Sequence, residues 1–474
     1  MKRMLSLMLA GAAFSGSAPF AWSASSPAII PAQFHSQAAG ASADPAVEQW
    51  WRSFHDPELD SLIERAVRAN LDLKMAASRL LEARAARGVA RSGLLPSIET
   101  SESGQRVRGG LTQGIFRPNA GGQSSLLAPF ETNIFQQGFD ASWEIDFFGG
   151  KRHALEAATA DAAATEEDRR ETLISLLAEV ARNYGELRGT QRRLEIAGHN
   201  IERQTDTLGL TRVRAEAGLG TELDVERQVS QLAATKATVP ALESARQMSI
   251  HRLSVLLGEE PGTLAGELTE VKPLPATPPV VPVGLSGDLL ERRPDVRRAS
   301  AAVAAASARV GVARSDFFPK ITLTGSAGRQ GTSYSGLTLG AGNFFAVGPA
   351  IKLPIFTGGR LRANMEAQKQ RLSQAQLAYQ STVLRSLEEA ENALTSYGRE
   401  QERREHLQAA AEASGEATGL ANELYTRGLA DFLTVLDAQR QQLAIEDDLV
   451  QSDTAVVTNL VALYKALGGG WNGR

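Results

Sequence analysis

The apolar and polar residues of the chain follow two different periods, one helical and one extended. Helical spacing covers six stretches, residues 57–93, 151–217, 219–257, 286–318, 360–427 and 429–467. The stretch 151–217 runs for 67 residues without a proline, which predicts a helix roughly 100 Å long at about 1.5 Å per residue. Such a helix is several times longer than a small domain is wide, so we expect a tall helical wall.

The last helical stretch indicates how these helices pack. Apolar residues recur there every seven positions, at Leu429, Leu436, Leu443, Val450, Val457 and Tyr464. A second column beside it holds Val435, Leu449, Val456 and Leu463, interrupted only by Gln442. A sustained seven-residue repeat predicts knobs-into-holes packing against neighbouring helices. In the equivalent stretch of the first half, Pro240 predicts a kink.

The order of elements occurs twice, because the chain is a tandem duplication. Residues 88–98 match residues 311–321 at seven of eleven positions, a constant offset of 223. Later segments repeat at an offset of 210, as Gly218-Leu219 and Gly428-Leu429 do. We therefore predict two copies of one unit, each with a helix, two strands, a long helix and a shorter helix.

This duplication predicts the domain boundaries. The first repeat spans residues 57–258, with strands at about 95–107 and 131–147, and the second spans 285–468, with strands at about 319–328 and 343–356. Residues 259–284 hold six of the 19 prolines and read as a semi-rigid, extended linker. Residues 24–56 are expected to form an extended N-terminal segment and 469–474 a short tail.

The strands alternate between an apolar and a polar face. In residues 135–147, Gln137 is the one polar residue on the apolar face, and the opposite face carries acids. Nothing in the neighbouring sequence offers a layer to cover the apolar face, so we expect lipid there and a watery lumen on the other side. The predicted lipid-facing residues are Phe135, Phe139, Trp143, Ile145, Phe345 and Val347. Four strands cannot close a barrel, and an open edge cannot face lipid, so copies of the chain must share one.

The N-terminal residues have the pattern of a targeting signal. Lys2 and Arg3 precede a short apolar stretch and then small residues, which predicts a signal peptide over residues 1–23. A buried N-terminal helix is the alternative. No segment of the chain offers 18 consecutive apolar residues, so a transmembrane helix is not expected. Export and a strand-based membrane domain together predict the outer membrane of a Gram-negative bacterium.

Composition excludes most other classes of function. The 474 residues carry a net charge of −4, without the basic excess that nucleic-acid binding requires. The absence of cysteine excludes disulfides, thiolate metal sites and a cysteine nucleophile. The six histidines lack ligand spacing, and no HExxH, GxSxG or P-loop pattern occurs. We therefore expect no enzyme, no metal and no cofactor.

Four motifs stand out, WWRSFHDPELD at 50–60, NLDL at 70–73, YTRG at 425–428 and DFLTVLDAQ at 431–439. With these motifs the chain resembles the TolC/OprM family of outer-membrane efflux proteins, from Trp50 to the C-terminus. The first two are similar to the branch that serves resistance–nodulation–division pumps. The resemblance implies an α + β membrane protein that forms a homotrimer. Its twelve-stranded barrel would continue into a twelve-helix periplasmic tunnel, whose tip meets an adaptor protein and an inner-membrane pump.

One feature departs from that branch, whose members commonly carry a lipid-modified cysteine at the mature N-terminus. The stretch Leu9-Ala10-Gly11-Ala12 has the shape of a lipobox with alanine in the cysteine position. We therefore expect no lipidation, and attachment to the membrane by the barrel alone.

The candidate gate lies where the helices turn at the periplasmic end. Glycines at the turns predict a left-handed conformation that ends each long helix. The residues expected to contact the adaptor are Gly218, Leu219, Gly428 and Leu429. Leu433 and Asp437 lie at i and i+4, hence on one helix face. By resemblance they match the family's constriction, a hydrophobic ring and an aspartate ring.

Two further expectations, and one alternative to the gate, concern the helical turns at the periplasmic end. Tyr425 is expected to pack beside the second turn. Arg227 occupies the position that corresponds to Asp437, so we hypothesise that these two residues lie close together and help hold the closed state. The alternative is that Leu433 belongs to the coiled-coil core and Asp437 is a solvated surface acid.

These features predict the exit duct of a tripartite efflux pump that passively conducts drugs or other small toxic compounds. A type I protein-secretion duct keeps the same fold with a different client. A periplasmic coiled-coil scaffold without a pore is the alternative from another class.

Overall fold

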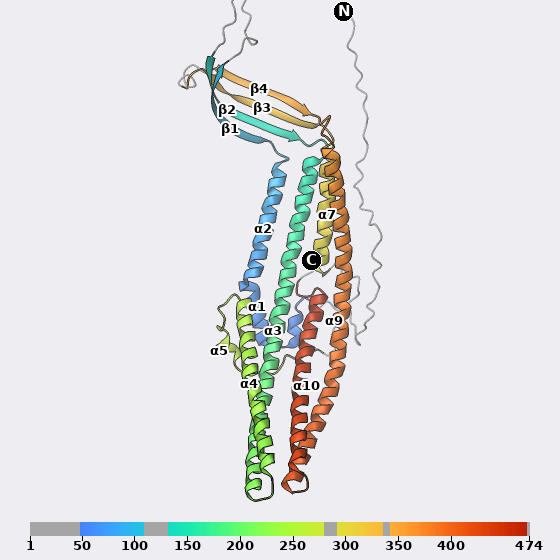
Figure 1. Cartoon of the computed structure of the whole chain (residues 1–474). Helices are drawn as coiled ribbons and strands as arrows, with labels where there is room; N and C mark the ends of the chain where they lie inside the picture. The colour runs from blue at the N-terminus through green and yellow to red at the C-terminus, as the bar shows by residue number, and fades with distance from the viewer. Residues whose placement is uncertain (1–47, 109–130, 279–291, 335–341, 472–474) are drawn as a thin grey trace, which may run out of the picture.

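The computed structural model describes residues 48–108, 131–278, 292–334 and 342–471 (Figure 1). The predicted signal peptide and most of the N-terminal segment lie outside these residues. The four-stranded sheet lies at one end of an elongated molecule, and the helices extend away from it (Figure 1). Among the described residues, every helix is too short or too polar to cross a bilayer.

The helices largely follow the predicted stretches. Helix α3 spans Gly150–Glu216 and α9 spans Arg360–Thr426, each 67 residues long. Each is followed by a shorter helix, α4 over Glu222–Leu256 and α10 over Phe432–Ala466. Helix α4 runs from Glu222 to Leu256 as one helix, with Pro240 in its interior.

The predicted single helix over 57–93 is wrong, because Asn70 divides it into α1, Pro57–Ala69, and α2, Leu71–Ser92. Asn70 has ψ of 132°, outside the helical range. Its side chain accepts from the backbone N–H of Leu73 and donates to the carbonyl of Leu256, both at 2.9 Å. The Asn70 side chain thus caps α2 and binds the end of α4. These two hydrogen bonds take the place of backbone hydrogen bonds that a continuous helix would make.

The second-half counterpart is interrupted at Arg293. Arg292 is helical, Arg293 before the proline is extended, and helix α7 spans Pro294–Ser315. A residue that precedes proline is disfavoured in the helical region. Residues 286–291 of the predicted stretch lie outside the described residues.

The heptad pattern of α10 is largely confirmed. The buried members of its two columns are Leu436, Val450, Val457, Tyr464, Val435, Val456 and Leu463. Gln442 is buried as well and donates to Glu446 one turn later at 2.7 Å. Leu429 is an exception, since it precedes the helix and is exposed.

The sheet is antiparallel, in the order β1-β2-β3-β4. The strands span Ser97–Arg108, Glu131–Ile145, Lys320–Gly331 and Gly342–Lys352. Each open edge, on β1 and on β4, has no partner among the described residues.

The register of the sheet gathers the predicted lipid-facing residues on one face. Phe139 of β2 pairs with Ala327 of β3, which pairs with Phe345 of β4. Trp143 of β2 pairs with Leu323 of β3. Phe139, Trp143, Ile145, Phe345 and Val347 are exposed. Phe135 is half-buried, because its ring covers Gly104 on the neighbouring strand and meets Tyr334 edge-on.

The main core lies midway along the helices, where the N-terminal residues join it. Trp50–Phe54 forms a 3₁₀ helix, so the predicted extended segment is wrong at this point. The Trp50 ring stacks on Tyr464 of α10, with centroids 5.2 Å apart. The linker is not uniformly extended either. Residues Ala265–Leu268 form the short helix α5, and Leu268 is fully buried because it packs in this core.

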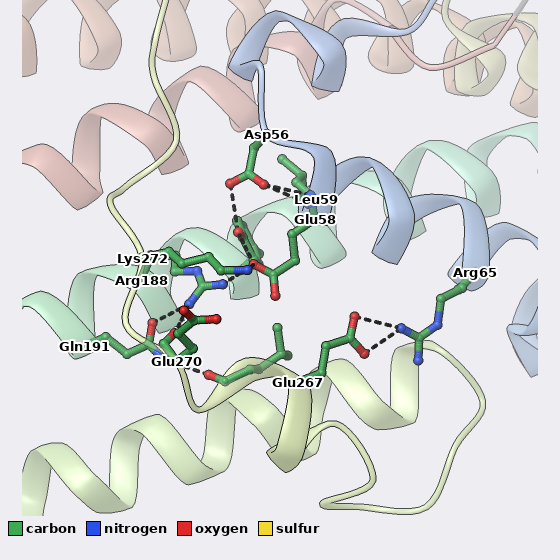
Figure 2. Close-up of polar contacts among 11 residues, drawn as sticks. Asp56, Glu58, Leu59, Arg65, Arg188, Gln191, Glu267, Glu270 and Lys272 are labelled. Atoms are coloured by element: carbon green, nitrogen blue, oxygen red, sulfur yellow. Dashed lines mark hydrogen bonds and ion pairs between the residues drawn. The ribbon is translucent and has the colours of Figure 1, made fainter.

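A buried polar cluster binds the linker to the first repeat (Figure 2). Arg188 of α3 is completely buried, pairs with Glu58 of α1, and donates to Gln191 and to the backbone carbonyl of Glu270, both at 2.7 Å. Lys272 contacts the same Glu58 carboxylate at 3.1 Å. Tyr184 also donates to Glu58, at 3.1 Å, and burial raises the pKa of its phenol well above the usual value.

We expect Arg188→Ala to lower the free energy of unfolding by about 3 kcal/mol, because it leaves the Glu58 carboxylate buried without its main partner. Arg192→Ala is the matched control, since Arg192 makes an exposed pair with Glu195 that contributes under about 1 kcal/mol. Denaturant titration followed by circular dichroism measures both. Equal midpoints for the two variants would show that the cluster does not stabilise the fold.

Candidate functional site

The two helical turns farthest from the sheet lie at the same end of the molecule (Figure 1). Gly218 and Gly428 adopt left-handed conformations, with φ of 71° and 74°, as predicted. The next residue in each turn, Leu219 or Leu429, donates its N–H back to the last turn of the long helix at 2.8 Å. This arrangement satisfies helix carbonyls that would otherwise be unpaired, so both turns are rigid Schellman caps.

The shorter helices begin with side-chain caps. Thr221 and Asp224 form a reciprocal capping box at the start of α4. Asp431 caps α10 and accepts from the N–H of Thr434 at 3.0 Å and from its hydroxyl at 2.7 Å. The hydrogen bonds from Thr434, with a smaller contribution from the charge of Arg227, hold the pKa of Asp431 below its usual value.

Tyr425 fills the interior of the second tip. Its buried ring meets Phe432 edge-on, with centroids 5.7 Å apart. The guanidinium of Arg214 lies over the other side, 4.7 Å from the ring centroid. Arg214 also donates to the carbonyl of Thr426 at 3.3 Å, so a residue of α3 binds the end of α9.

Arg214 was not among the residues predicted for the tip. Its position in the last turn of α3 was the available signal, since basic side chains there commonly bind helix carbonyls. The carbonyl that it binds lies 212 residues away in the sequence, and no local pattern indicates that contact.

Leu433 and Asp437 lie on a face of α10 that is exposed in the single chain. Leu433 is 43% exposed and Asp437 is exposed, whereas Val435 and Leu436 between them are fully buried. Within the single chain, Leu433 is therefore not a member of the coiled-coil core, contrary to the alternative considered for it.

The hypothesised pair of Arg227 and Asp437 is not formed within one chain. Arg227 lies 3.9 Å from Asp224 on its own helix. Its positive charge contributes to the lowered pKa of Asp431, the residue just before α10. Among the described residues, no ion pair joins Arg227 to Asp437.

The tips carry exposed apolar side chains in duplicate. Leu219 and Leu223 of the first tip correspond to Leu429 and Leu433 of the second, and all four are exposed. Leucines that remain in water at rigid turns indicate a contact surface for another protein or another copy. In the part of the chain that the structure describes, no group of three or more acidic or histidine side chains is arranged to hold a metal.

The family profile described as "Outer membrane efflux protein" matches residues 62–259 and 285–469. The chain belongs to this family. The two matched segments fall on the two halves of the duplication.

Relatives in the outer membrane efflux protein family align over nearly the full length. The chain is 33% identical to the pyoverdine export outer membrane protein OpmQ of Pseudomonas aeruginosa, over 98% of this chain and 95% of that protein. It is 31% identical to the toluene efflux pump outer membrane protein TtgC of Pseudomonas putida, over 90% of this chain and 86% of that one.

Solved structures agree with the fold. The outer-membrane channel OprN superposes with a TM-score of 0.86 at 36% identity, covering 94% of this chain and 98% of that one. The open state of the Neisseria gonorrhoeae MtrE outer membrane channel superposes with a TM-score of 0.80 at 27% identity, covering 94% and 96%.

The chain is therefore an outer-membrane efflux channel and not an enzyme. As in its structural relatives, three copies complete a barrel that continues into the periplasmic helical tunnel. The efflux function is confirmed over the protein-secretion duct and the scaffold without a pore.

We expect Gly428→Ala to loosen the second tip, because an alanine held at a φ of 74° costs about 1 to 2 kcal/mol. Gly209→Ala is the control, since Gly209 lies within α3 with open space around its Cα. Hydrogen exchange of the tip amides should accelerate in the first variant only. Unchanged exchange at residues 424–434 of Gly428→Ala would contradict this role of the glycine.

Proposed function

We propose that this channel is the exit duct of a tripartite efflux pump and closes at its periplasmic tips through two stacked rings. Leu433 of three copies forms an apolar ring, and Asp437 of the same copies forms a ring of carboxylates. The observation that carries this proposal is that the two side chains share one exposed face of α10 while their neighbours are buried.

The chemistry of the two rings is complementary. Three leucines brought together on an axis exclude water and close the path to polar solutes. Three carboxylates brought close around the axis attract and hold cations in the path, so the ring narrows the constriction and makes it selective for charge.

Buried contacts position the gate. Tyr425, Phe432 and Arg214 hold the end of α9, the start of α10 and the end of α3 together. Arg227 adds an exposed attraction to Asp431 across the two hairpins. Exposed charge pairs contribute little because water and salt screen them, so Arg227 biases the closed state without locking it.

We expect Asp437→Ala and Leu433→Ala to raise single-channel conductance in planar bilayers, roughly twofold or more, because each removes one ring from the constriction. Asp448→Ala is the matched control, since Asp448 is an exposed acid higher on the same helix. Unchanged conductance in both ring variants would exclude this gate. Arg227→Ala with unchanged conductance would remove only the cross-hairpin contact from the mechanism.

The exposed tip leucines and the groove above them fit a periplasmic adaptor. The groove lies between the two hairpins and includes Asn200, Arg203 and Thr207 of α3 together with Gly415 and Gly419 of α9. Polar side chains and glycines leave room there for a helix of another protein. We assign Gly218, Leu219, Gly428 and Leu429 to the contact between this surface and the adaptor, which links the duct to a resistance–nodulation–division transporter.

The double variant Leu219→Ser, Leu429→Ser should reduce co-purification of the adaptor about tenfold, because each exposed leucine loses roughly 1 kcal/mol or more of apolar contact. Val271→Ser is the control, an exposed apolar residue of the linker. The trimer itself should persist in both variants. Full adaptor recovery with the double variant would place the contact elsewhere.

The cargo that fits this duct is a range of small organic compounds. Relatives are named for pyoverdine export, toluene efflux and antibiotic efflux, which are chemically diverse. A passive duct gated by adaptor contact transmits what its pump delivers, so selection lies with the pump.

A further inference from the structure

Each repeat contains a joint at which its shorter helix ends against the start of an upper helix (Figure 1). At the first joint, α4 ends at Leu256 and α2 begins after Asn70. At the second joint, α10 ends at Ala466 and α7 begins after Arg293. Helices α2 and α7 both have 22 residues, and α4 and α10 both have 35. The offsets of 223 and 210 therefore map the first joint onto the second.

The same hydrogen bond closes both joints. Asn70 donates from its side chain to the carbonyl of Leu256 at 2.9 Å, and Arg293 donates to the carbonyl of Ala466 at 3.0 Å. These carbonyls belong to the last residue of each shorter helix, where the helix itself supplies no partner. Asn70 is 4% exposed and Arg293 is 7% exposed, so both bonds are shielded from water. A buried side chain before each upper helix thus holds the end of the shorter helix.

A glycine lets the helices meet closely at each joint. Gly258 and Gly468 adopt left-handed conformations, with φ of 73° and 72°. A Cβ on Gly258 would lie 2.8 Å from the carbonyl oxygen of Ala69, and a Cβ on Gly468 would lie 3.2 Å from Cγ of Arg293. This close fit leaves the shorter helix little freedom to shift while its joint is intact.

The second joint is charged and also holds the long helix. Arg293 donates to both oxygens of Asp295, at 3.0 and 2.7 Å, and to Glu389 of α9 at 2.6 Å. In the first repeat the counterpart of Glu389 is Glu179, which binds Arg252 of α4 at 2.8 Å. The position in α10 that corresponds to Arg252 holds an alanine. In the second repeat, one guanidinium therefore links α7, α9 and α10.

The second joint bears on the gate because α10 carries both ring residues. Ala466 lies 29 residues after Asp437 on this helix. At about 1.5 Å per residue, the joint and the carboxylate ring are roughly 44 Å apart along the helix. A turn of about 3° at the joint would displace Asp437 by about 2 Å over that length. Helix α4, which hangs from the first joint, carries neither ring residue.

The lower parts of the two hairpins have separate apolar clusters among the described residues. One cluster belongs to α9 and α10 and includes Tyr425, and the other belongs to α3 and α4 and includes Val225. Between α3 and α10 the contacts below the main core are polar, as between Arg193 and Asp447 at 2.6 Å. Partly exposed ion pairs of this kind exchange with water at little cost. The direction of α10 is therefore set mainly at its upper end.

We propose that Arg293 is a positioning residue of the gate, which fixes the direction of α10 by holding its upper end to α7 and α9. Loss of the guanidinium releases the Ala466 carbonyl and the Glu389 carboxylate together. Helix α10 then turns about the second joint, and the ring side chains move apart. This inference rests on the proposed gate.

Single-channel recording of the full-length trimer tests this role with a matched pair of variants. Arg293→Ala and Asn70→Ala each remove a buried partner from one helix-end carbonyl. Arg293→Ala should raise the conductance of the resting channel about twofold, because a displacement of about 2 Å per copy widens the constriction. Asn70→Ala should leave the conductance unchanged, although denaturant titration should show both variants to be less stable.

Equal conductance of these two variants would overturn the positioning role of Arg293, because the joint would then contribute only stability. Asp437→Ala, recorded alongside, separates the joint from the gate. Raised conductance in Asp437→Ala without a change in Arg293→Ala would contradict the joint alone. Unchanged conductance in both would contradict the gate, and the joint with it.

Arg293→Gln decides the same question if the alanine variant does not assemble. Glutamine keeps a donor for the Ala466 carbonyl but lacks the charge and the fork that bind two carboxylates. The matched control is Arg385→Gln, since Arg385 is an exposed arginine of α9 that lines the same cavity as Arg293. Only Arg293→Gln should raise the conductance, and equal values for the two glutamine variants would overturn the proposal.

Discussion

Unpaired backbone groups at the two edges of the sheet are the constraint on which the assembly depends. The strands β1 and β4 each present an open edge, and the exposed face between them is apolar. In hydrocarbon, each unsatisfied backbone group costs several kcal/mol. Only closure of the sheet by further copies removes that cost. The helices continue from the strand ends, so closing the barrel also brings the helices into a tube.

Duplication lets one unit satisfy this constraint everywhere. The same hairpin and long helix occur twice in each chain. Because α3 and α9 have equal lengths, both turns reach the same level and can act together at the tip. The repeats diverge where function requires it. Arg227 and Asp437 occupy corresponding positions, yet only Asp437 lies on the face assigned to the gate.

Much of the architecture was predictable because it depends on neighbours in the sequence. The heptad columns of α10, the alternation in β2 and the glycine at each turn act over a few residues, and the structure confirms them. The predicted secondary structure was wrong where a residue distant in the sequence determines the local conformation. Asn70 ends α1 because its side chain binds a carbonyl 186 residues away, and α5 forms where the linker packs against the first repeat.

The sequence alone determined the long helices, the two faces of the sheet and the offsets of the duplication, since each is recorded in local period or in similarity. Tertiary structure decided which charges meet. Arg188 is buried against Glu58, Arg214 lies over Tyr425, and the charge of Arg227 contributes to the lowered pKa of Asp431. A long side chain can reach several partners from one backbone position. The packing of helices that are remote in sequence selects among them.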